Sequence, residues 1–309
     1  MPVDEYDTPW KEAIEIYFRE CIEFFFPIAA AEIDWERGYN FLDKELQQVV
    51  RDAEFGKRLV DKLVQVWLKD GTEQWVLIHL EVQSSEEKDF AKRMYIYYYR
   101  LFDRYNQSIA SFAILADERP TWRPNEFRDE LWGCEVNFKF PIVKLLDYSE
   151  QWNQLEASSN PFATVVMAHL KAKETRQDNE VRKRWKLYLT KQLYEKGYQR
   201  EDIINLFRFI DWVLKLPEDL EISFWDEVTE YEENKKMPYV TSVERRGIQK
   251  GKEEGILKGI EALLEVKFGV EALELLPEIS QIQDVDVLES ILSGIKTKNT
   301  LEEIRETYL

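Results

Sequence analysis

Apolar and polar positions alternate along two runs between residues 59 and 83, on either side of a short polar turn. The apolar side chains fall at even positions on both runs: Val60, Val64, Val66 and Leu68, then Val76, Ile78, Leu80 and Val82. Because successive strand residues point to opposite faces of a sheet, this pattern predicts a β-hairpin that buries its even positions together. Such pairing needs a loop of odd length. Lys69, Asp70 and Gly71 supply one, with Gly71 in the left-handed conformation.

The other face of the predicted hairpin gathers four polar residues: Asp61, His79, Glu81 and Gln83. Cross-strand partners lie about 4.5–5.5 Å apart at Cβ, which would place Asp61 opposite His79 and diagonal to Glu81. Two carboxylates at that spacing can share one hard cation such as Mg²⁺ or Mn²⁺. The same residues are also what a half-exposed hairpin presents to solvent, so the pattern alone leaves both interpretations open.

The rest of the first 150 residues predicts an α/β fold with a mixed central sheet flanked by helices. A first helix is expected over residues 10–26, and its glutamates include a candidate extra acidic ligand: Glu12, Glu15, Glu20 and Glu23. Further elements are a loop and short helix within 33–56, an aromatic-rich helix from Ser84 or Ser85 to about Tyr105, and strands over 108–117 and 137–146. The aromatic helix is expected to cover the sheet.

Beyond Tyr148 the strand signals stop and the periodicity becomes helical. Helices are predicted over residues 160–174, 179–196, 200–215 and 218–233. The pattern indicates four parts: a core over 1–150, a helical domain over 151–237, a glycine-spaced helical connector over 238–259, and a small acidic helical domain over 260–309.

Charge is unevenly distributed along this chain, whose formal net charge is −18. Residues 171–200 carry ten basic and four acidic side chains, whereas residues 218–233 carry eight acidic ones and no basic one. Affinity for nucleic acid comes mainly from Lys and Arg, which makes Lys183, Arg184 and Lys186 candidate DNA contacts. An ordinary solvated helix face would give the same pattern.

Several classes of protein lack their signatures. The sequence has no basic leader and no apolar stretch of membrane-spanning length, which predicts a soluble cytoplasmic protein with no membrane partner. Cys21 and Cys134 stand far apart in the sequence. The chain has only two histidines and no closely spaced pair of cysteines, which argues against a structural zinc site. Phosphate-binding, dinucleotide-binding and serine-hydrolase motifs do not occur.

Asp61, followed about twenty residues later by Glu81-Val82-Gln83, resembles the D…(D/E)xK core of the PD-(D/E)XK nuclease superfamily. More narrowly, it is similar to the Rpn-type recombination-promoting nucleases, also called putative transposases, whose last motif position is commonly Gln. Asp7-Thr8-Pro9-Trp10-Lys11 is similar to the opening motif of that family, so Asp7 and Lys11 are motif-supporting residues. Lys267-Phe268-Gly269 and the following helices resemble a small domain often appended to these proteins.

The resemblance implies a PD-(D/E)XK-like core and a Mg²⁺-dependent or Mn²⁺-dependent endonuclease, with Asp61 and Glu81 as metal ligands and DNA as the partner. Gln83 is the departure from the superfamily, because an amide orients water but carries no charge and shuttles no proton. This leaves the general base open, and His79 is the candidate, although a strand histidine without catalytic function is the alternative. A nuclease fold retained as an oligomeric interaction module is the competing function.

Four glycines recur at a spacing of four residues: Gly247, Gly251, Gly255 and Gly259. Each costs a helix interior about 1 kcal/mol relative to Ala, so a compensating contact is expected. Close approach of two such helices would produce a homodimer through residues 245–260, and a flexible, partly helical linker is the alternative.

Overall fold

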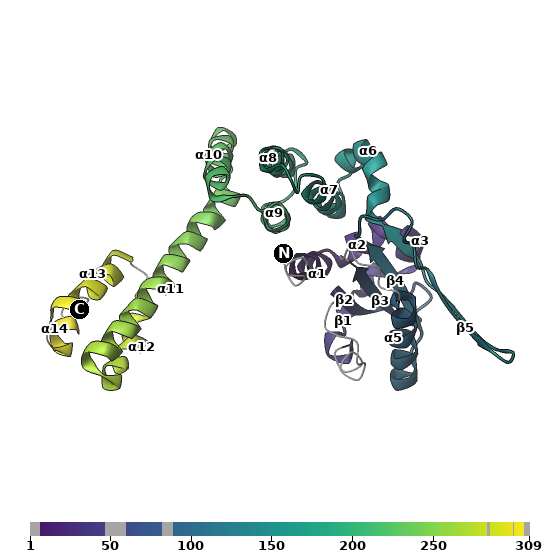
Figure 1. Ribbon diagram of the computed structural model, residues 1–309, viewed down its shortest axis with the longest axis horizontal. Coiled ribbons are helices and arrows are strands. Elements are labelled where there is room, and N and C mark those ends of the chain that lie inside the picture. The colour runs from purple at the N-terminus through teal and green to yellow at the C-terminus, as the bar shows by residue number, and fades with distance from the viewer. Residues whose placement is uncertain (1–6, 47–59, 82–88, 283–284, 299, 306–309) are drawn as a thin grey trace. The chain divides into compact units, whose positions relative to one another are not determined.

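The computed structural model of the chain describes residues 7–46, 60–81, 89–282, 285–298 and 300–305 (Figure 1). These residues form two compact units, which divide between Val228 and Thr229. The boundary falls inside a helix, α10 (Glu218–Lys235), and the predicted core and most of the predicted helical domain belong to the first unit.

A five-stranded mixed sheet forms the centre of the first unit, in the order β1-β2-β3-β4-β7. Its strands are β1 (Tyr39–Phe41), β2 (Val60–Trp67), β3 (Glu73–Glu81), β4 (Ile109–Leu115) and β7 (Ile142–Lys144). The first three strands are antiparallel neighbours, whereas β3, β4 and β7 run parallel. The predicted α/β class with a mixed sheet is confirmed. Strand β1 falls where a loop was predicted, because three residues are too short to display an alternating pattern.

The predicted hairpin is present in the predicted register. Asp61 pairs with His79 and Val64 with Val76, so even positions face even positions across β2 and β3. The loop has three residues: Leu68 N donates to Thr72 O at 2.8 Å, and Gly71 adopts a φ of +88°.

Among its described residues, the hairpin has buried side chains on both faces rather than on one. On the odd face, Leu63 and Trp75 are buried under α5 (Phe90–Tyr105), whose Tyr97 and Leu101 pack against them. Toward the N-terminal end of the same helix, Phe90 and Met94 contact Ala113 and Leu115 of β4. The aromatic helix therefore covers the sheet as predicted.

The even face is covered by α1 (Asp7–Ile16), α2 (Phe18–Phe25) and α3 (Pro27–Glu32). Phe26 stacks on Phe112 of β4 with ring centroids 4.2 Å apart, and Phe18 packs against Tyr39 of β1. The single helix predicted over 10–26 is wrong, because the chain leaves the helical conformation at Tyr17. The buried ring of Tyr17 turns its hydroxyl to donate to Asp202 Oδ1 at 3.0 Å.

The segment predicted as one strand over 137–146 divides at Phe140 and Pro141. Its first part is β6 (Cys134–Lys139), which pairs with β5 (Glu126–Leu131) in a two-stranded ribbon that projects from the sheet unit (Figure 1). Its second part is β7. Proline cannot donate to a ladder, which is the physical reason for the break.

Four helices after β7 match the predictions closely: α7 (Pro161–Glu174), α8 (Asn179–Glu195), α9 (Arg200–Val213) and α10. The short helix α6 (Trp152–Ala157), which precedes them, was not predicted. Asn160 caps α7 by accepting from Phe162 N at 2.9 Å. Trp10 of α1 is fully buried against Phe162 of α7 and Phe209 of α9, which joins this helical region to the sheet.

The second unit contains α11 (Val240–Phe268), α12 (Leu276–Ile279), α13 (Val285–Thr297) and α14 (Leu301–Arg305) around one apolar core. The glycine-spaced segment is part of the helix α11. A Cβ added at Gly259 would lie 3.3 Å from Leu292 Cδ1 of α13, so at this glycine the close approach occurs within the chain. None of the described helices combines the length and apolar character that crossing a membrane requires.

Candidate functional site

Backbone pairing brings three of the predicted site residues to one end of the β2–β3 hairpin. Asp61 and His79 are direct partners, and Glu81 is two residues beyond His79 at the end of β3. All three occupy odd positions and therefore belong to the face that carries Leu63 and Trp75. Their side chains, and the whole of Gln83, lie outside the described residues, so the predicted shared metal stays a prediction.

Glu81 also lies at the carboxyl edge of the parallel part of the sheet. Its Cα pairs with that of Leu115 on β4, and Leu115 pairs with Lys144 on β7. Ligands of open α/β sheets bind outside the carboxyl ends of parallel strands, because the loops that leave those ends can shape a site. The position of Glu81 thus fits a binding edge.

A buried guanidinium lies in the helix that covers this face. Arg93 of α5 is only 4% exposed, and its guanidinium carbon lies 5.4 Å from the centroid of the Phe90 ring. The burial of Arg93 was not predicted from the sequence. The signal was its spacing, since Arg93 lies three residues after Phe90 and four before Tyr97, on the buried stripe.

A buried ion pair, which was not predicted, lies at the same edge of the sheet. Lys144 Nζ donates to the carboxylate of Asp117 and, at 3.3 Å, to Trp122 O, and both ionic side chains are almost fully buried. Asp117 lies two residues after the end of β4, so the pair ties the ends of β4 and β7 to the loop that carries Trp122.

Two basic side chains of helix α7 donate hydrogen bonds to the carbonyl oxygen of Ala116. His169 Nε2 donates to it at 3.2 Å, and Lys173 Nζ donates to it as well. Burial lowers the pKa of His169 to about 3, aided by the nearby positive charge of Lys173. Burial also lowers the pKa of Lys173 to about 8, against the raising effect of Glu118 and Asp117.

The predicted DNA contacts need a correction. Lys186 is fully buried: its Nζ lies 2.7 Å from Asp211 Oδ1 and 2.9 Å from Glu221 Oε1. Lys183 Nζ donates to Glu227 Oε1 at 2.6 Å. The acidic segment of α10 thus neutralises the basic face of α8, which is why charge is polarised along the sequence. Of the three predicted contacts, Arg184 is the one whose side chain is exposed.

Two of the four candidate glutamates in the opening helices are engaged in ion pairs. Glu15 accepts from Lys62 Nζ, which also lies 3.0 Å from Asp43 Oδ2. Lys62 occupies an even position of β2, so this cluster lies on the face opposite to Asp61. Glu23 pairs with Arg19 at 2.7 Å. Lys11 is partly buried in α1, and the side chain of Asp7 is not among those described.

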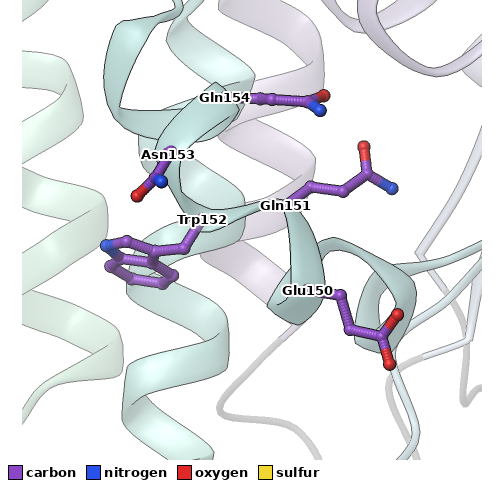
Figure 2. Close-up of a pocket in the computed structure, with 5 residues that line it drawn as sticks. All are labelled: Glu150, Gln151, Trp152, Asn153 and Gln154. Atoms are coloured by element: carbon purple, nitrogen blue, oxygen red, sulfur yellow. The ribbon is translucent and has the colours of Figure 1, made fainter.

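A hollow lies elsewhere in the described part of the chain. A hollow of about 220 Å³ is lined by five consecutive residues, 150–154, and Figure 2 shows them around a single turn of chain. None of them is a predicted site residue. Among the described side chains, no group of three His, Cys, Asp or Glu residues is arranged to hold a metal ion.

Comparison of the chain with protein-family models, with curated proteins and with solved structures found no match.

Proposed function

We propose that this chain is a metal-dependent nuclease that hydrolyses DNA phosphodiester bonds at the open end of the β2–β3 hairpin. The observation that carries the proposal is the pairing of Asp61 with His79, with Glu81 diagonal to the pair and at the carboxyl edge of the sheet. The order of elements supports it: three helices, α1 to α3, precede β1, β2, β3, α5 and β4, which is similar to the αβββαβ order of the superfamily that the motifs resemble.

The donor set fits a hard divalent cation. Carboxylate oxygens are the protein ligands that Mg²⁺ and Mn²⁺ prefer, and one or two suffice when water and substrate phosphate complete the shell. Asp61 and Glu81 would hold the ion. When bound, it supplies Lewis-acid polarisation of the phosphate and a water of lowered pKa.

Two other side chains would act on the attacking water. The Gln83 amide would orient the attacking water, and His79 would accept its proton, since an unperturbed imidazole is largely neutral and basic at pH 7. A recombination or mobile-element context follows from the resemblance alone. The burial of Lys186 and the pairing of Lys183 favour the alternative of an interaction module, because both withdraw charge from DNA.

The test is nicking of supercoiled plasmid with Mg²⁺ or Mn²⁺, comparing wild type, Asp61→Asn and Glu81→Gln. Each substitution removes a negative charge while preserving shape, and we expect activity to fall by two orders of magnitude or more. The matched control is Asp103→Asn, an exposed carboxylate on α5. Activity that is absent from wild type with either metal, or unchanged in Asp61→Asn, contradicts the nuclease proposal.

A further inference from the structure

The β5–β6 ribbon has features that the proposed nuclease chemistry does not use. Its base is anchored to α5, where Phe127 stacks on Tyr95 at 5.0 Å and Phe138 packs against Tyr98 at 4.8 Å between ring centroids. Beyond that base it projects with an apolar tip, where Leu131 is 62% exposed and Trp132 97% exposed. A solvated tryptophan at such a tip contributes nothing to the core of its own chain.

The turn at the tip is strained to present that tryptophan. The two-residue loop of Trp132 and Gly133 has positive φ at both positions, +53° and +83°, as in a type I′ hairpin turn. Asn, Asp or Gly normally fills the first position, because a side chain with a bulky Cβ substituent resists the left-handed conformation. Backbone strain of this kind is typical of functional positions. Trp132 is therefore placed for a contact outside the chain.

The outer edge of β6 is open for strand pairing. Phe140 N donates to Asn125 O at 3.0 Å, which marks the pair 125–140 as hydrogen-bonded. Hydrogen-bonded and non-hydrogen-bonded pairs alternate along an antiparallel ladder. The backbone groups of Glu135, Asn137 and Lys139 therefore point away from β5, and all three residues are exposed. In the described part of the chain this sheet has only two strands, so this edge has no neighbouring strand.

We propose that the ribbon is a self-association surface, in which β6 pairs antiparallel with β6 of a second copy about a two-fold axis at Asn137. This register sets Glu135 opposite Lys139 of the second copy, and Lys139 opposite its Glu135. Both ion pairs form at once because a two-fold axis makes every contact twice. The outward backbone groups of the three residues meet their counterparts in the same register.

The charges of the ribbon select this partner over nucleic acid. Residues 126–139 carry four acidic and two basic side chains, which repel a phosphate backbone. Within the ribbon, Glu130 lies directly opposite Glu135, an unfavourable like-charge pair. Lys139 of the second copy would lie on the other side of Glu135 and relieve that repulsion.

The same register gives the exposed tip a contact. Antiparallel pairing centred on Asn137 carries Leu131 and Trp132 past Lys139 of the second copy, toward the body of that subunit. A rigid aromatic side chain is the type of residue that anchors protein interfaces. This inference does not depend on the nuclease proposal, and it uses a surface different from the glycine-spaced helix.

The test is a charge swap measured by light scattering after gel filtration and by sedimentation. The wild-type full-length chain is expected to dimerise at micromolar to hundreds of micromolar concentration. Glu135→Lys and Lys139→Glu each put like charges opposite one another twice, and each should weaken the dimer about tenfold or more. The double variant Glu135→Lys/Lys139→Glu restores opposite charges and should restore the dimer, and an equimolar mixture of the single variants should form a heterodimer.

Two further variants separate pairing from folding. Asn137→Pro removes an outward-facing N–H and should abolish the dimer, because proline is tolerated on an edge strand but blocks addition of a neighbour. Trp132→Asn suits the left-handed turn position, so it should keep the ribbon folded while weakening the dimer. A monomeric wild type at hundreds of micromolar overturns the proposal. So does a dimer indifferent to Asn137→Pro, or one that the double swap fails to restore.

Discussion

Mild acid is expected to destabilise the first unit through His169. The imidazole is almost completely buried on α7, its Nε2 donates to Ala116 O, and its ring lies 5.6 Å from that of Trp10. Its Nδ1 has no hydrogen-bond partner among the described residues. Protonating this ring in the folded state would bury a charge next to the positive Lys173, which is why its pKa falls to about 3.

The sign and size of the effect follow from linkage. The unfolded histidine has a pKa near 6.5, so below that pH the unfolded state binds a proton that the folded state excludes. The contribution of His169 to the free energy of unfolding is therefore fully present above pH 6.5, and it decreases as the pH falls. Between pH 7 and pH 5.5 the loss amounts to about 1 kcal/mol, and it grows by about 1.4 kcal/mol for each further pH unit until the folded pKa is reached.

The assay is urea unfolding of the full-length chain at pH 7 and pH 5.5. Because the sequence has two histidines, few other groups titrate in this interval. His169→Gln keeps a donor for Ala116 O but does not titrate, so between the two pH values it should lose about 1 kcal/mol less than the wild type. His79→Gln is the comparison variant and should retain the loss that comes from His169. Equal pH dependence in wild type and His169→Gln would refute the reasoning.

Two other substitutions test buried charge and helix packing. Lys144→Met leaves the carboxyl group of Asp117 buried without its cation, and should lower the free energy of unfolding by about 3–5 kcal/mol; Asp117→Asn/Lys144→Met should recover part of that loss in the same urea titration. A single variant no less stable than the double would contradict this. In α11, Gly255→Ala enters open space and should raise stability by up to about 1 kcal/mol, whereas Gly259→Ala should gain less because Leu292 must shift. Equal gains in thermal melting would contradict that difference.

Local chemistry made much of the fold predictable. The even-numbered apolar positions and the glycine turn were enough to predict the register of β2 with β3, because a shift of one residue would turn the apolar positions of the two strands to opposite faces of the sheet. Proline, asparagine and glycine signals similarly bounded the helices after residue 160. The polar ribbon escaped prediction, since a Trp-Gly turn between mostly charged strands carries no hairpin signal.

The burial of three basic side chains could not be predicted from the sequence, for a different reason. Lys62, Arg93 and Lys144 each occupy a strand or helix position whose burial depends on elements elsewhere in the chain. The partner of Lys144 is 27 residues away, and those of Lys62 are 47 and 19 residues away. Periodicity reports whether a face is apolar, and it cannot report that a charge on that face meets its counter-charge after folding.

The ion pairs between α8 and α10 also bear on how this chain can vary. Lys186 contacts two carboxylates on two different helices, so replacing it alone leaves like charges facing each other across the contact. A change of sign there becomes tolerable when Asp211 and Glu221 change with it. Substitutions at these positions should therefore be correlated among related sequences. A change of charge in one of the two segments should be accompanied by the opposite change in the other.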